Sequence, residues 1–126
     1  MRGFAEREQI TIGGLEVAEI SSIPYDDDFF DIASVIGVLE YCSIDYIETA
    51  LKELNRVLKP GAKAVLDIPN PTHPYVTDMQ KLEEYLERPI YIHSRVEFEK
   101  ILEPLFKTER IDDSRVMIKY FVQTVK

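Results

Sequence analysis

The chain has 126 residues, of which 15 are Lys or Arg and 23 are Asp or Glu, so its formal net charge is −8. This length suits one domain over residues 1–126, with the polar residues 1–9 expected to be flexible, and the single Cys42 permits no internal disulfide. An acidic chain without a basic stripe disfavours nucleic-acid binding, and without a long apolar run or a leader we expect no membrane association and a cytoplasmic location.

The first structural signal is a pair of β-branched segments in residues 10–20, on either side of Gly13 and Gly14. Two adjacent glycines suit a type I′ turn, which needs a positive φ at both central positions, so this stretch taken alone predicts a β-hairpin. An acidic turn follows at Asp26, Asp27, Asp28 and Asp31. Carboxylate clusters can bind hard cations, but consecutive aspartates are also typical of turns, and we expect a solvated connector and no metal site.

A strand, a helix and a second strand come next in the chain. Phe30–Ile36 and Lys63–Ile68 are short apolar runs, which predict two strands buried on both faces. Between them, apolar residues recur at spacings of three and four and so predict one buried face of a helix: Ile44, Ile47, Leu51, Leu54 and Leu58. Together these elements predict a βαβ unit with a parallel strand pair.

The ends of this helix carry recognisable signals. Asp45 and Glu48 have the spacing of a capping box, and Ser43 is an alternative cap one turn earlier. Pro60 and Gly61 are expected to stop the helix, because proline cannot continue it and glycine adopts the left-handed conformation that often follows a last turn.

The rest of the chain predicts a proline-rich loop, two helices and two strands. The loop, Asn70–Tyr75, follows a strand and carries His73 and Tyr75, which are candidates for a general base and a stacking residue or are plain packing residues. Residues 77–87 and 94–105 predict helices, with capping boxes at Thr77/Gln80 and Ser94/Glu97. Residues 106–111 and 116–125 predict strands around a turn.

Four segments, in their order and spacing, resemble the second half of a class I S-adenosylmethionine-dependent methyltransferase, most closely the type 11 group. The segments are Ile23–Asp31, Val38–Tyr41, Ala50–Gly61 and Val65–Pro71. The resemblance implies an α/β fold, a truncated Rossmann-like methyltransferase sheet. Its core strands 31–36 and 63–68 would be parallel, its C-terminal strands antiparallel, and helices would lie on the faces. Leu15–Ile20 would correspond to a further strand.

The resemblance also implies where S-adenosylmethionine would contact the chain. Ligands of open α/β sheets bind at the carboxyl ends of the strands. In the family, the positions of Ile36 and Gly37 face the methionine part of the cofactor, and that of Glu19, followed by Ile20, holds an acid that contacts adenine. Tyr41 is a further candidate for the catalytic site. It stands where family members often have histidine, so histidine-assisted chemistry is not implied there. Residues 77–87 would form a lid over the substrate.

The family's glycine-rich cofactor loop has no counterpart here, since the residues before Ile23 contain only Gly3, Gly13 and Gly14. The strand that would flank residues 31–36 in the family is missing with it, and a bare apolar edge favours pairing. We therefore expect either that residues 10–20 move in beside this edge or that a second copy or a partner chain pairs there.

Two functions fit this pattern. The first is methyl transfer from S-adenosylmethionine to a small molecule, with the missing cofactor-binding part supplied by a second copy or a partner. The second is a non-catalytic subunit with a methyltransferase fold that has lost cofactor binding, since a fold alone does not carry an activity.

Overall fold

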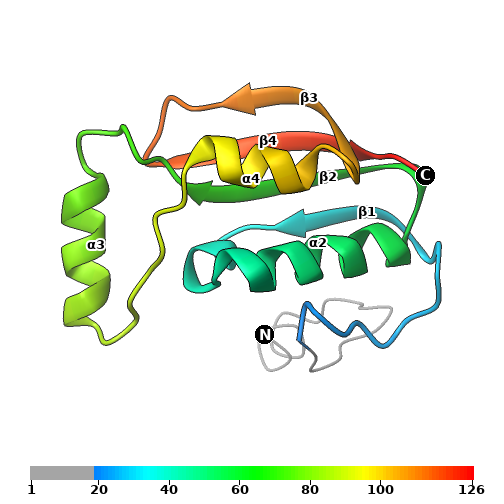
Figure 1. The fold of residues 1–126 in the computed structure, drawn as a ribbon, viewed down its shortest axis with the longest axis horizontal. Helices are drawn as coiled ribbons and strands as arrows, with labels where there is room; N and C mark the ends of the chain where they lie inside the picture. Colours follow the sequence, from blue (N-terminus) through cyan, green and yellow to red (C-terminus); the bar gives the residue numbers. More distant parts are fainter. Residues whose placement is uncertain (1–18) are drawn as a thin grey trace, which may run out of the picture.

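A computed structural model describes residues 19–126 of the chain as a four-stranded sheet with helices (Figure 1). The strands are β1 (Phe30–Val35), β2 (Leu58–Pro69), β3 (Phe106–Asp112) and β4 (Met117–Thr124), in the spatial order β1-β2-β4-β3. β1 and β2 are parallel, whereas β4 is antiparallel to both β2 and β3. The expected parallel core with antiparallel C-terminal strands is confirmed.

Helix α2 (Ile44–Val57) connects β1 to β2, which completes the predicted βαβ unit. Ser43 caps it by accepting a hydrogen bond from the Tyr46 amide at 3.3 Å, so the alternative cap is the correct one and the Asp45/Glu48 box is not used. The helix does not end at Pro60 and Gly61 as expected. It ends at Val57, because Leu58 is already extended and begins β2.

The core lies between the sheet and the helices α2 and α4 (Arg95–Leu102), which both cover the same face (Figure 1). Side chains from both layers are fully buried there: Leu39, Ile47, Leu51, Leu58, Leu66, Ile68, Phe98, Leu102, Ile118 and Tyr120. The predicted cap of α4 is confirmed, since the Ser94 side chain accepts a hydrogen bond from the Glu97 amide at 3.1 Å.

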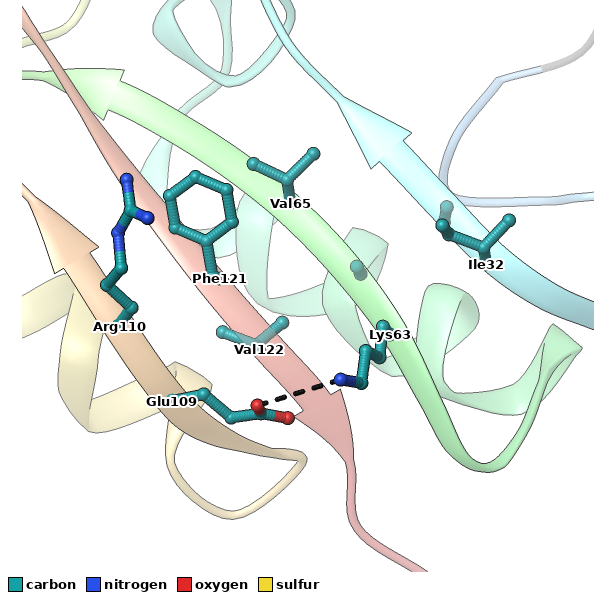
Figure 2. A pocket seen from close by; sticks show the side chains of 9 residues that line it. Ile32, Lys63, Val65, Glu109, Arg110, Phe121 and Val122 are labelled. Atoms are coloured by element: carbon teal, nitrogen blue, oxygen red, sulfur yellow. Dashed lines mark ion pairs between the residues drawn. The ribbon is translucent and has the colours of Figure 1, made fainter.

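The opposite face of the sheet carries no helix of the described residues, and Figure 2 views it from that side. The prediction that β1 is buried on both faces was therefore wrong. Val35 points to the helix layer and is 6% exposed, whereas Ile32 on the open face is 72% exposed. A periodic apolar run does not reveal which of its two faces the rest of the chain will cover.

Helix α3 (Val76–Tyr85) lies beyond the carboxyl ends of β1 and β2, apart from the helix layer (Figure 1). The prediction of a Thr77/Gln80 capping box was wrong. The helix begins at Val76, one residue before the expected Thr77, and the preceding Tyr75 makes no side-chain cap hydrogen bond. Val76 is buried, but Leu82, Tyr85 and Leu86 are largely exposed. No helix in residues 19–126 has the length and apolar character needed to cross a membrane.

The N-terminal part of the described chain begins with an antiparallel bridge between Glu19 and Ser22. The hairpin expected in residues 10–20, and most of the strand expected at Leu15–Ile20, lie outside the described residues. Within residues 19–126, β1 pairs with β2 alone and is an edge strand of the sheet. The expected bare edge is thus present in the described part of the chain.

Leu51 tests how far the fold depends on the α2 interface. Its side chain is fully buried, so we expect Leu51→Ala to lower the free energy of unfolding by about 2–5 kcal/mol through lost transfer energy and a cavity. The control is Val96→Ala on α4, a position that is 76% exposed, where a change within about 0.5 kcal/mol is expected. Urea denaturation measures both, and equal effects at the two positions would contradict the packing described above.

Candidate functional site

A hollow of about 550 Å³ lies at the carboxyl end of β1. It is lined by residues from the N-terminal segment, β1, the turn that follows it and α2: Glu19, Ile20, Ile23, Ser34, Val35, Gly37, Val38, Tyr41, Cys42 and Tyr46. Three of the four residues expected to contact the cofactor, Glu19, Ile20 and Gly37, therefore share one hollow with Tyr41, a candidate catalytic residue. The fourth expected cofactor residue, Ile36, is 43% exposed beside Gly37 but does not line the hollow.

Gly37 makes the sharp turn that leads from β1 into the 3₁₀ helix η1 (Leu39–Tyr41). Its φ is +72°, a left-handed conformation that side chains disfavour, and a Cβ placed there would meet no atom within 4 Å. The backbone at this turn is thus open to whatever occupies the hollow. Its amide donates a hydrogen bond to Asp67 Oδ1 at 3.0 Å.

Asp67 and Glu40 are acids that the functional hypotheses from sequence did not include. Asp67, in β2, is 3% exposed, and burial raises the pKa of its carboxyl group. Burial also raises the pKa of Glu40, whose Oε1 atom is buried and has no hydrogen-bond partner among the described residues. One signal in the sequence could have identified Asp67: it is the charged residue within the otherwise apolar run of residues 64–69.

Tyr41 links η1 to α3, because its hydroxyl group donates to Glu83 Oε2 at 3.2 Å. Cys42, next in the chain, is partly buried, and burial raises the pKa of its thiol. Its carbonyl oxygen lies 2.8 Å from His93 Nε2, and the Tyr91 amide donates to the Glu40 carbonyl at 2.7 Å. Segment 88–94 therefore runs along η1 and holds it from the side of α3.

His73 and Tyr75 lie together in the proline-rich loop after β2, but neither lines the hollow. His73 Nδ1 accepts a hydrogen bond from the Tyr75 amide at 3.1 Å, and the two ring centroids are 5.6 Å apart. Tyr75 is 66% exposed. The structure thus groups the expected residues in two places, with Tyr41 at the hollow and the His73/Tyr75 pair on the loop.

Asn70 organises that loop and was also missed. It is 4% exposed, and its Nδ2 group donates to the carbonyl oxygens of Asp113 and Arg115, at 3.0 and 3.2 Å. Its Oδ1 atom accepts from the amide and the hydroxyl group of Thr72. One side chain therefore ties the loop to the turn between β3 and β4.

A second hollow, of about 520 Å³, crosses the open face of the sheet (Figure 2). Ile32, Val65 and Phe121 contribute apolar surface to it. Arg110 lies over the Phe121 ring, 4.5 Å from its centroid, and Lys63 forms an ion pair with Glu109 at 3.9 Å. No group of three His, Cys, Asp or Glu side chains in residues 19–126 is arranged to hold a metal ion.

Comparison with known proteins relates the sequence to a family and to curated enzymes. The sequence model of a family described as a methyltransferase domain matches residues 2–66. A 2-phytyl-1,4-naphtoquinone methyltransferase of Nostoc punctiforme is 41% identical over 66 residues, which are 52% of this chain and 28% of that protein. The chain thus spans well under half the length of this curated relative.

Solved structures share the fold at low sequence identity. The PH0226 protein of Pyrococcus horikoshii matches with a TM-score of 0.77 at 15% identity, over 99% of this chain and 65% of that one. A Burkholderia thailandensis 1,6-didemethyltoxoflavin-N1-methyltransferase, solved with 1,6-didemethyltoxoflavin and S-adenosylhomocysteine bound, matches with a TM-score of 0.63 at 13% identity. That match covers 86% of this chain and 49% of the other.

The role of Asn70 can be tested by removing its side chain. We expect Asn70→Ala to lower the free energy of unfolding by about 1–3 kcal/mol, because two partly buried hydrogen bonds to the carbonyl groups of Asp113 and Arg115 are lost. Limited proteolysis should then cut the loop at residues 71–75 faster than in the parent chain. Thr77→Ala at an exposed position nearby is the control, and equal proteolysis of both variants would exclude the organising role.

Proposed function

Because the chain belongs to the methyltransferase-domain family, whose model covers residues 2–66, we propose that it takes part in methyl transfer from S-adenosylmethionine to a small molecule. The observation that carries this proposal is the hollow at the carboxyl end of β1, which collects Glu19, Ile20, Gly37 and Tyr41. Ligands of open α/β sheets bind in this position.

The residues around the hollow suit this cofactor. Its volume of about 550 Å³ is in the ordinary range of small-molecule sites, roughly 300–1,000 Å³. The turn at Gly37 leaves open space where a Cβ would stand, so a ligand can approach the backbone closely. Glu19 supplies a carboxylate that can accept hydrogen bonds from hydroxyl or amino groups, and Ile20 supplies apolar surface.

The bound cofactor would supply a methyl group already activated by a positive sulfonium. The protein's contribution is then to bind the donor, exclude water and align the acceptor, since such alignment alone can lower the barrier greatly. The loop with His73 and Tyr75, together with Tyr41, is our candidate for the acceptor side. The relative of Nostoc punctiforme is named a 2-phytyl-1,4-naphtoquinone methyltransferase, and a quinone substrate supports a small-molecule acceptor here.

We further propose that a second copy pairs with the edge of β1 that no described strand covers, and completes the site. Ile32 is 72% exposed on this edge strand and also lines the hollow on the open face, so apolar surface continues from the edge across the sheet. An edge strand that pairs with its own copy about a two-fold axis forms an antiparallel ladder. Such a dimer is closed, because each copy uses its edge for the other.

Cofactor binding and molecular mass test the proposal together. We expect calorimetric titration of the 126-residue chain with S-adenosylhomocysteine to show micromolar affinity, and light scattering to give the mass of a dimer. A dimer without detectable heat would favour the non-catalytic subunit instead. A monomer without heat would contradict both the activity and the pairing.

The pairing has its own test at Ile32. We expect Ile32→Lys to shift the mass to that of a monomer while the circular dichroism spectrum stays unchanged, because a lysine on an edge strand opposes strand pairing. Val96→Lys is the matched control, since Val96 is 76% exposed on α4 and should leave the mass as it was. A folded Ile32→Lys variant with the parent mass would exclude this edge as the interface.

A further inference from the structure

Asp67 is the only charged residue in the described part of the chain that is buried. Burying a carboxylate costs free energy unless hydrogen bonds or opposite charges offset it. The hydrogen bond found for Asp67 comes from the Gly37 amide at 3.0 Å, across the pair of parallel strands. A buried acid with one such contact beside a cleft is a candidate for a functional role.

Gly37 is the residue through which this hydrogen bond would act on the hollow. The chain leaves β1 at Val35 and turns at Gly37, and the next residues, Val38 and Tyr41, line the hollow. A Cβ placed at Gly37 would meet nothing within 4 Å, so no described side chain packs over this turn. The hydrogen bond from its amide to Asp67 Oδ1 is the contact that joins the turn to β2.

We propose that Asp67 is a positioning residue, whose ionised carboxylate fixes the Gly37 turn and thereby the wall of the hollow that receives the cofactor. This inference rests on the proposed function for its effect on ligand binding. The link between Asp67 and Gly37 itself does not depend on any ligand. A carboxylate accepts a hydrogen bond more strongly than the neutral acid does, so protonation of Asp67 loosens the turn.

Two charged groups face Asp67 from neighbouring elements. Lys119 of β4, which is its partner in the antiparallel register, favours the ionised form. Glu40 of η1 is the second group: burial is the main cause of its raised pKa, and the negative charge of Asp67 raises that pKa further. Burial outweighs the other influences and raises the pKa of Asp67 above its ordinary value of 3.8.

The raised pKa of Asp67 determines how the stability of the fold depends on pH. An acid whose pKa is raised by folding binds its proton more tightly in the folded state, so stability falls as the pH rises through the window above 3.8 and stays lower at neutral pH. Asp67→Asn removes the buried charge and should unfold at neutral pH no more easily than the parent chain. Any loss of binding in this variant is then not a loss of fold.

Nuclear magnetic resonance of the full chain tests the link directly. We expect the amide proton of Gly37 to shift between pH 7.5 and 4 with the titration of Asp67, and this shift to vanish in Asp67→Asn. Asp31→Asn is the matched control, because the Asp31 side chain is 80% exposed on the neighbouring strand and should leave the Gly37 titration unchanged. A Gly37 amide proton that titrates equally in Asp67→Asn and the parent overturns the proposal.

Binding of S-adenosylhomocysteine provides the second readout. We expect Asp67→Ala to weaken it by about tenfold or more and Asp67→Asn by less, since a hydrogen bond to a charged group is lost in the first and weakened in the second. The affinity of the parent should also fall as the pH drops, whereas that of Asp67→Asn should not. Unchanged affinity in folded Asp67→Ala overturns the proposal. Absence of binding by the parent chain refutes the proposed function instead, and the Gly37 titration then tests the link between Asp67 and Gly37 by itself.

Discussion

The parallel pairing of β1 with β2 is the constraint on which the rest of this structure depends. Parallel strands end at the same edge of a sheet, so the turn at Gly37 and the loop after Pro69 lie side by side. This proximity brings Asp67 of one strand within hydrogen-bond distance of the turn that follows the other. The helix α2, which must return the chain to the start of β2, packs on the sheet and supplies much of the core.

Much of this fold could be predicted from the sequence, because its signals are local. The spacing of Ile47, Leu51 and Leu54 identified the buried face of α2, and Ser94 with Glu97 marked the start of α4. Other predictions failed where contacts between distant parts of the chain determine the local structure. Leu58 continues the helical spacing yet belongs to β2, because its backbone pairs with Phe30 of β1 instead of extending α2 by one residue. Likewise, the apolar character of Ile32 did not reveal that its face of the sheet stays open.

For the candidate site, the grouping of residues came from a family pattern. Glu19 and Ile20 lie far in sequence from Gly37 and Tyr41, and no periodicity would group the two pairs, but the resemblance assigned all four to one site. All four line the hollow, and their part in binding or catalysis stays a prediction. Asp67 and Asn70 were missed because their roles consist of hydrogen bonds to residues 30 to 45 positions away. His73 and Tyr75 contact each other instead of the hollow, since the loop is fixed at Asn70 and extends away from β1.

Helix α3 adds Val76 to the buried residues and leaves Leu82 and Tyr85 exposed. The segment that contains it is anchored at its two ends, by the hydrogen bonds of Asn70 and by the cap at Ser94. Replacements of exposed residues on α3 therefore cost the core little free energy, whereas Val76 and Ile90 of the same segment are buried. In evolution, such an exposed surface can diverge faster than the sheet, so related chains can differ at α3 while they keep the same scaffold.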